Sequence, residues 1–189
     1  PMSFSTVSAF MMFGTVLTIF GAMSTKLFTS FMQKGRAYVV FMVLTAVFAG
    51  AFIFFKSEHI GLMFLFQGLA SFTLGPLAVL QWSIYTDTAD FGEWRFHRRA
   101  TGLVMAAAMF AIKFGLAVGG AALGWIMQAF GFIPNVDQTE QSLLGIRMVM
   151  SVFPAVAALV AAALMLKYPL THQKMEEIER DLTARRTAK

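Results

Sequence analysis

Five apolar stretches run through this chain, over residues 4–25, 37–55, 60–85, 103–130 and 143–166. A helix of about 20 apolar residues crosses the hydrocarbon core of a bilayer, and each stretch is of that order. A soluble helical bundle would need a polar face on every helix, and none of these stretches has one. We therefore expect an all-α membrane protein with five transmembrane helices within residues 1–166, followed by a tail, residues 167–189.

The composition supports this class of protein and narrows the chemistry. Hydrophobic residues make up 58% of the chain and charged residues only 13%, whereas soluble domains carry about 25% charged residues. The chain has no cysteine, which excludes a disulfide framework and a thiolate metal site. A net charge of +5 is compatible with nucleic-acid binding, but the distribution of the basic residues indicates a different reason for it.

Basic residues fall on alternate links between the stretches. The first and third links hold Lys26, Lys34, Arg36, Arg95, Arg98 and Arg99, and the tail is also basic. The second link has only Lys56, and the fourth has only Arg147 at its edge. The positive-inside rule then predicts a cytoplasmic carboxyl terminus and an external amino terminus. Because whole transporters usually begin inside, and residues 1–4 do not resemble a signal peptide, we expect a fragment without its front half.

Lys113 lies in the middle of the fourth stretch, and no other ionisable residue occurs between Arg99 and Asp137. A charge at the bilayer centre costs at least ~2.5–3.5 kcal/mol. Small residues share its helical face or have the spacing that lets helices approach closely: Ala106, Gly115, Ala117, Gly119, Gly120 and Gly124. The alternative is a lysine that snorkels to the interface, but Lys113 lies roughly 15 Å inside the span. We expect it to face other protein, with a partner from the substrate or another part of the protein, since the five stretches contain no carboxylate.

Polar and aromatic groups interrupt the third stretch at Gln81, Trp82 and Tyr85. Gln81 and Tyr85 share a helical face, and their side chains can hydrogen-bond to sugar hydroxyls, while aromatic rings offer flat surfaces to a sugar. We take these three residues as candidates for substrate contact or coupling. Trp82 and Tyr85 equally fit an aromatic belt at the membrane interface.

The third link, residues 85–102, is the charged link. Its acidic and basic groups are Asp87, Asp90, Glu93, Arg95, Arg98 and Arg99. The three carboxylates recur every three residues and so lie on one helical face. With His97 they could bind a divalent ion or do acid–base chemistry, but the neighbouring arginines would neutralise them. The pattern favours a cluster of ion pairs that gates the cytoplasmic side, and no metal site.

The tail predicts a short amphipathic helix over residues 172–186. Met175, Ile178 and Leu182 form one apolar stripe. Charged residues four apart form two candidate ion pairs: Glu176 with Arg180, and Asp181 with Arg185. We expect a solvated helix that lies on the cytoplasmic face of the membrane.

Three motifs in order resemble one known family. They are Asp87-Thr-Ala-Asp-Phe-Gly-Glu-Trp with the basic run after it, Lys113 in the next stretch, and the link at residues 131–146. Together they are similar to the glycoside–pentoside–hexuronide:cation symporters, which include melibiose permease and belong to the major facilitator superfamily. The resemblance covers residues 34–167.

The resemblance implies a fold of twelve helices in two halves, of which this chain would be helices 8–12. It implies a sugar or glycoside bound at the midplane, coupled to sodium, proton or lithium, with no further cofactor. Lys113 matches the family lysine near both sites, and Asp87, Asp90 and Glu93 match its conformational-switch link. The cation-binding aspartates of the family lie in the amino-terminal half. Melibiose transporters have Trp, Gln and Thr where this chain has Ala78, Ala108 and Met109, which points away from melibiose itself.

Sequence and resemblance together predict part of a sugar:cation symporter that works by alternating access in a bacterial inner membrane. Its expected partners are the sugar, a monovalent cation, the missing amino-terminal half and the lipid bilayer, and not nucleic acid. An intramembrane enzyme is excluded because the five stretches contain no His, Asp, Glu or Cys from which to build a catalytic site. The alternative is a small, non-transporting membrane subunit that binds a partner membrane protein.

Overall fold

A computed structural model describes residues 4–55 and 59–187 of the chain, so Lys56 of the second link lies outside the described residues. The described part is helical and contains no strand. Its elements are α1 (Phe4–Phe31), α2 (Lys34–Gly50), the 3-10 turn η1 (Ala51–Phe54), α3 (Ile60–Phe96), α4 (Thr101–Ala129), α5 (Glu140–Met150), α6 (Val152–Met165) and α7 (His172–Thr187).

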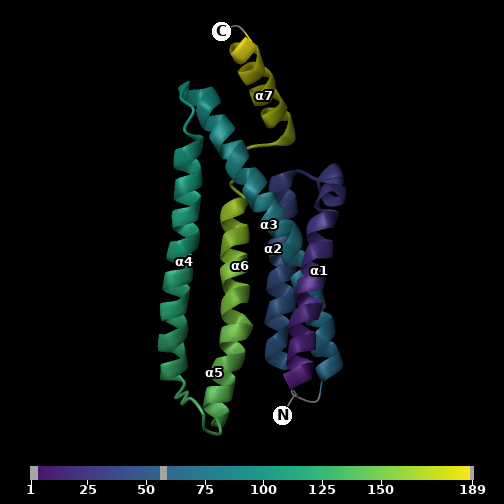
Figure 1. Cartoon of the computed structure of the whole chain (residues 1–189), viewed down its shortest axis with the longest axis vertical. Coiled ribbons are helices and arrows are strands. Elements are labelled where there is room, and N and C mark those ends of the chain that lie inside the picture. The colour runs from purple at the N-terminus through teal and green to yellow at the C-terminus, as the bar shows by residue number, and fades with distance from the viewer. Residues whose placement is uncertain (1–3, 56–58, 188–189) are drawn as a thin grey trace.

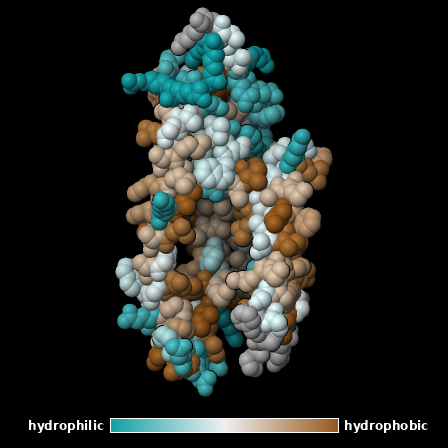
Figure 2. All heavy atoms as spheres, in the orientation of Figure 1, coloured by the Kyte–Doolittle hydropathy of each residue, from teal (hydrophilic) through white to brown (hydrophobic). Residues whose placement is uncertain are grey.

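Five segments of the described chain are long and apolar enough to cross a membrane, which confirms the predicted fold class. They are Ser5–Phe31, Lys34–Phe54, Ile60–Phe96, Thr101–Ala129 and Glu140–Met165. Figure 2 shows the corresponding surface, in which an apolar band lies between hydrophilic ends.

α1 ends at Phe31, beyond the predicted end at residue 25, so Lys26 lies on the helix and not in the link. Two further segments differ from their predicted bounds for identifiable reasons. The third was expected to end at residue 85, but α3 continues to Phe96 because Phe91 and Trp94 pack against the apolar side of α7. The last was expected to be continuous, but it breaks at Ser151 between α5 and α6. Pro154 has no N–H with which to continue the hydrogen-bond ladder there.

The helices form a packed group from which α4 stands apart (Figure 1). α3 packs against both α1 and α2, and α2 also packs against α6. Ala37 and Phe41 of α2 pack with Leu77 and Leu80 of α3 in a buried cluster. By contrast, α4 contacts α3 near one end and α5 near the other.

Two glycines set the distance between α1 and α3. A Cβ atom on Gly75 would collide with backbone atoms of Thr18 and Ala22, and one on Gly21 would collide with the carbonyl of Phe72. Only hydrogen fits at either position, so the two backbones pass almost in contact, as small residues allow in membrane helices.

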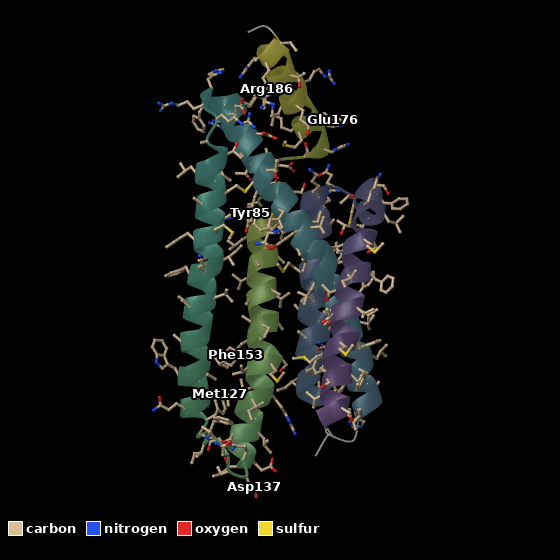
Figure 3. All side chains as sticks on the ribbon, in the orientation of Figure 1. Tyr85, Met127, Asp137, Phe153, Glu176 and Arg186 are labelled. Carbon is tan, nitrogen blue, oxygen red and sulfur yellow. The ribbon has the colours of Figure 1, made fainter. Side chains whose placement is uncertain are left out.

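One end of the molecule gathers the α1–α2 link, the α3–α4 link and α7 (Figure 1). The other end holds the α4–α5 link, which contains Asp137 (Figure 3). The links that are rich in lysine and arginine therefore lie together, as the alternation along the sequence predicts. The side of the membrane that this end faces stays a prediction.

Candidate functional site

Lys113 lies near the middle of α4 and is exposed. Within the described residues it makes no hydrogen bond or ion pair. Its neighbours Phe110 and Phe114 are also exposed, and a Cβ atom built on any of the four glycines that follow Lys113 in this helix, Gly115, Gly119, Gly120 and Gly124, would meet no described atom within 4 Å. The described part of the chain therefore does not supply the protein that we expected against the small-residue face, and an external partner for Lys113 stays a prediction.

Gln81 and Tyr85 form the polar part of a cavity of about 390 Å³ between α2, α3 and α6. The Gln81 amide Nε2 donates to the Tyr85 hydroxyl at 2.6 Å. Tyr38 and Tyr168 also line the cavity. Small-molecule sites typically have about 300–1,000 Å³ and a few polar groups in an apolar wall, and this cavity has that form.

Tyr38 and Tyr168 are not among the site residues that the sequence pattern predicts. The chain has only three tyrosines, and all three line this cavity. Each tyrosine lies near the predicted cytoplasmic end of its segment. This shared position along the membrane normal could have indicated from the sequence that the three side chains lie close together. Trp82 does not line the cavity: its ring touches Tyr85 edge-on, with centroids 5.7 Å apart, and its side chain is half exposed.

Tyr168 follows α6, outside the membrane-spanning segments. Its hydroxyl is buried, and no described residue forms a hydrogen bond with it. Burial raises the pKa of this phenol, and the nearby negative charge of Asp87 adds to the increase. Tyr168 therefore stays neutral, and its ring lies against Gly35 of α2, where a Cβ atom would approach Cδ1 to 2.9 Å.

Asp87 of the charged link forms an ion pair with Lys34, at the start of α2, and not with the arginines of the charged link. Both of its carboxylate oxygens accept hydrogen bonds from Lys34 Nζ, at 3.0 and 2.9 Å. The Asp87 side chain is only 9% exposed, so the pair is partly shielded from solvent and joins the start of α2 to α3. Our expectation that the neighbouring arginines neutralise all three carboxylates is thus wrong for Asp87.

The rest of the charged link is only partly paired within the described chain. Glu93 accepts a hydrogen bond from Arg186 of α7 at 2.9 Å, and Arg99 lies 3.9 Å away. Asp90 is half-buried and forms no ion pair with a described residue. Arg95 lies over the rings of Phe91 and Phe96, and the described residues contain no group of three or more His, Asp or Glu side chains that could hold a metal.

The tail helix α7 is docked on α3 and does not lie free. Met175, Ile178 and Leu182, the predicted stripe, are buried against the end of α3. The predicted pairs between Glu176 and Arg180 and between Asp181 and Arg185 do not form. Asp181 instead accepts from the Trp94 indole at 2.8 Å. Docking explains the loss of the second pair, because the Trp94 indole binds the Asp181 carboxylate that Arg185 was expected to bind.

Comparison with known proteins relates the sequence of this chain to a family of transport proteins. The family model described as MFS/sugar transport protein matches residues 3–172. The provisionally named glycoside/cation symporter YagG of Escherichia coli is 29% identical over 180 residues, which is 95% of this chain and 39% of YagG.

Two further relatives match shorter parts. A provisionally named sulfoquinovose importer of Salmonella typhimurium is 32% identical over 126 residues, covering 66% of this chain and 27% of the importer. The glucuronide carrier protein homolog of Escherichia coli is 33% identical over 110 residues, covering 58% of this chain and 24% of the homolog. The chain thus spans well under half the length of these relatives, and none of them is named as an enzyme.

Proposed function

The chain belongs to the MFS/sugar transport protein family, and from this premise we propose that it forms part of a sugar:cation symporter in a bacterial inner membrane. In this proposal it supplies five of twelve helices, and the remainder of the protein supplies the others. The end that gathers the basic links faces the cytoplasm, in keeping with the positive-inside rule.

The observation that carries the proposal is the uncovered lysine of α4. Lys113 is the only charged residue between Arg99 and Asp137, and the small-residue face beside it is open. Charged groups within membrane helices usually face a water-filled cavity or another part of the protein. A transport pathway between this chain and the rest of the carrier provides such a cavity, with Lys113 on its wall.

Two half-bundles then rock about a central site and expose it to each side in turn. Lys113 organises the charge balance that couples the cation to the sugar. Gln81 and Tyr85 offer their amide and hydroxyl groups to the sugar, and Trp82 flanks them at the membrane interface. Asp87, Asp90 and Glu93 form and break ion pairs as the cytoplasmic side closes, and Asp90 is the carboxylate left open for a partner outside this chain.

The substrate that we propose is a glycoside or a hexuronide, and the coupling ion is sodium, proton or lithium. Relatives with names in this class support the first part. The absence of the aromatic residue at Ala78 that melibiose transporters have argues against melibiose.

An uptake panel on the full-length gene product tests the proposal. Cells that express it should accumulate at least one radiolabelled glycoside, glucuronide or xyloside above the external concentration. This accumulation should depend on sodium or on the proton gradient, and cells that carry the empty vector should show none. Uptake that only equilibrates, whatever the cation, would rule out symport. No uptake of any panel sugar, together with co-purification of a second membrane protein, would favour the subunit alternative.

A further inference from the structure

α7 lies almost wholly beyond the region that the family model matches, which ends at His172. It nevertheless packs firmly on the charged link. Ile178 is completely buried, and Met175 and Leu182 are almost so. Their contacts with Phe91 and Trp94 cover one side of the last turns of α3, and burial of this kind is the main source of stability for a short docked helix.

Polar contacts fix the docked helix in one register. Besides the bond from the Trp94 indole to Asp181, Lys174 Nζ lies 4.4 Å from the centre of the Trp94 ring. Arg185 donates to the carbonyl of Trp94 at 3.2 Å, and Figure 3 shows Arg186 at the same end of α3. On the α3 side, these contacts are all made by Trp94, which belongs to the charged link.

Glu93 is the carboxylate of the charged link to which the docked α7 binds, through Arg186. Arg186 binds its Oε2 at 2.9 Å, Arg99 lies on the same oxygen at 3.9 Å, and the Glu93 side chain is only 18% exposed. Arg186 and Arg99 already place two positive charges beside this carboxylate, so a cation from another part of the protein binds Glu93 less favourably while α7 is docked. Two positively charged partners that compete for one carboxylate are coupled negatively, and the coupling is reciprocal.

We propose that α7 competes with the rest of the carrier for Glu93. When α7 is docked, it withholds Glu93 from ion pairs between the two halves, and this favours opening of the cytoplasmic side. When α7 is released, Glu93 becomes available and the closed state is stabilised. The inference rests on the proposed function, in which the charged link pairs across the halves.

Proteolysis tests the docking without any need for transport. Trypsin should cut the wild-type, full-length protein at Arg180 slowly, because cleavage follows the population of released α7. Ile178→Asp should speed this cut at least tenfold, whereas Ala184→Asp, which adds the same charge on the exposed side of α7, should not. Exposed ion pairs contribute modestly, so Arg186→Gln and Glu93→Gln should each speed the cut roughly two- to fivefold, and the double variant should add nothing further.

Sugar exchange in vesicles tests the competition. Arg186→Gln should slow exchange in the wild-type background, because Glu93 is freed, and should have no effect in the Glu93→Gln background. An equal effect of Arg186→Gln in both backgrounds would overturn the inference while leaving symport intact. If no sugar is exchanged at all, the proposed function fails. The competition, which rests on that function, then fails with it, and the proteolysis result tests only the docking contact, which a wild-type cleavage rate for Glu93→Gln would contradict.

Discussion

Replacing Lys113 by alanine in the full-length protein should strongly reduce coupled accumulation of the sugar. The ammonium group is the only charge within the span of α4, and in our account it links the cation to the substrate. Coupling between two ligands typically changes affinity by about 5- to 150-fold, so the accumulation ratio should fall by a factor in that range. The measurement is cation-driven uptake of the sugar into energised vesicles, compared with passive exchange.

Two controls make the result specific. Lys113→Arg keeps the charge and should retain part of the accumulation. Lys26→Ala removes an exposed lysine near the end of α1 and should leave accumulation unchanged. Cation-driven accumulation at the wild-type level in Lys113→Ala would refute the role of this residue.

Replacing Gly75 by alanine should strongly destabilise the bundle. The added methyl group would lie inside the backbone of α1, against Thr18 and Ala22. Backbone atoms of two long helices cannot move aside as a flexible side chain can, so we expect a loss of about 3 kcal/mol or more, the upper end of the range for overpacking. The yield of monodisperse protein in detergent and its thermal unfolding temperature measure the loss.

Gly92→Ala is the matched control for this substitution. Gly92 lies on the same helix, but a Cβ atom there would meet nothing within 4 Å. Alanine is favoured over glycine in a helix by roughly 0.5–1 kcal/mol, so Gly92→Ala should be neutral or slightly stabilising. Equal unfolding temperatures for the two variants would contradict the close crossing of α1 and α3.

The transmembrane helices were predictable because their length and apolarity are local properties of the sequence. The residues at which these helices begin and end were harder to predict. α3 extends to Phe96 because Phe91 and Trp94 gain contacts with α7, a segment far along the chain. The break at Ser151 could not have been predicted from Pro154 alone, since Pro76 also lacks an N–H and α3 continues through it without a break.

The glycines show what spacing alone cannot decide. The spacing in α4 predicted a close helix contact, yet a Cβ at Gly120 or Gly124 would touch no described atom. The close crossing occurs instead at Gly21 and Gly75. Small residues permit a close approach on any helix, but only the arrangement of the bundle determines which face has a neighbour.

The same limit applies to the candidate site. The sequence identified Gln81 and Tyr85, which the structure joins by a hydrogen bond, because four residues make one helical turn. It did not identify Lys34 as the partner of Asp87, since 53 residues separate them. Local pattern identified the charged groups of the link, but the bundle gives Asp87 and Glu93 their partners from α2 and α7 and gives Asp90 no ion pair among the described residues.

The most direct test of the account is the water accessibility of position 113. This chain has no cysteine, so Lys113→Cys can be made the only thiol of a cysteine-free full-length carrier. Ala111→Cys, about 200° round the helix, is the control. Our account predicts that a charged, water-soluble methanethiosulfonate labels position 113 and not 111, and that the transported sugar slows the labelling. Labelling of position 113 only by a lipid-soluble maleimide, unaffected by sugar, would contradict it.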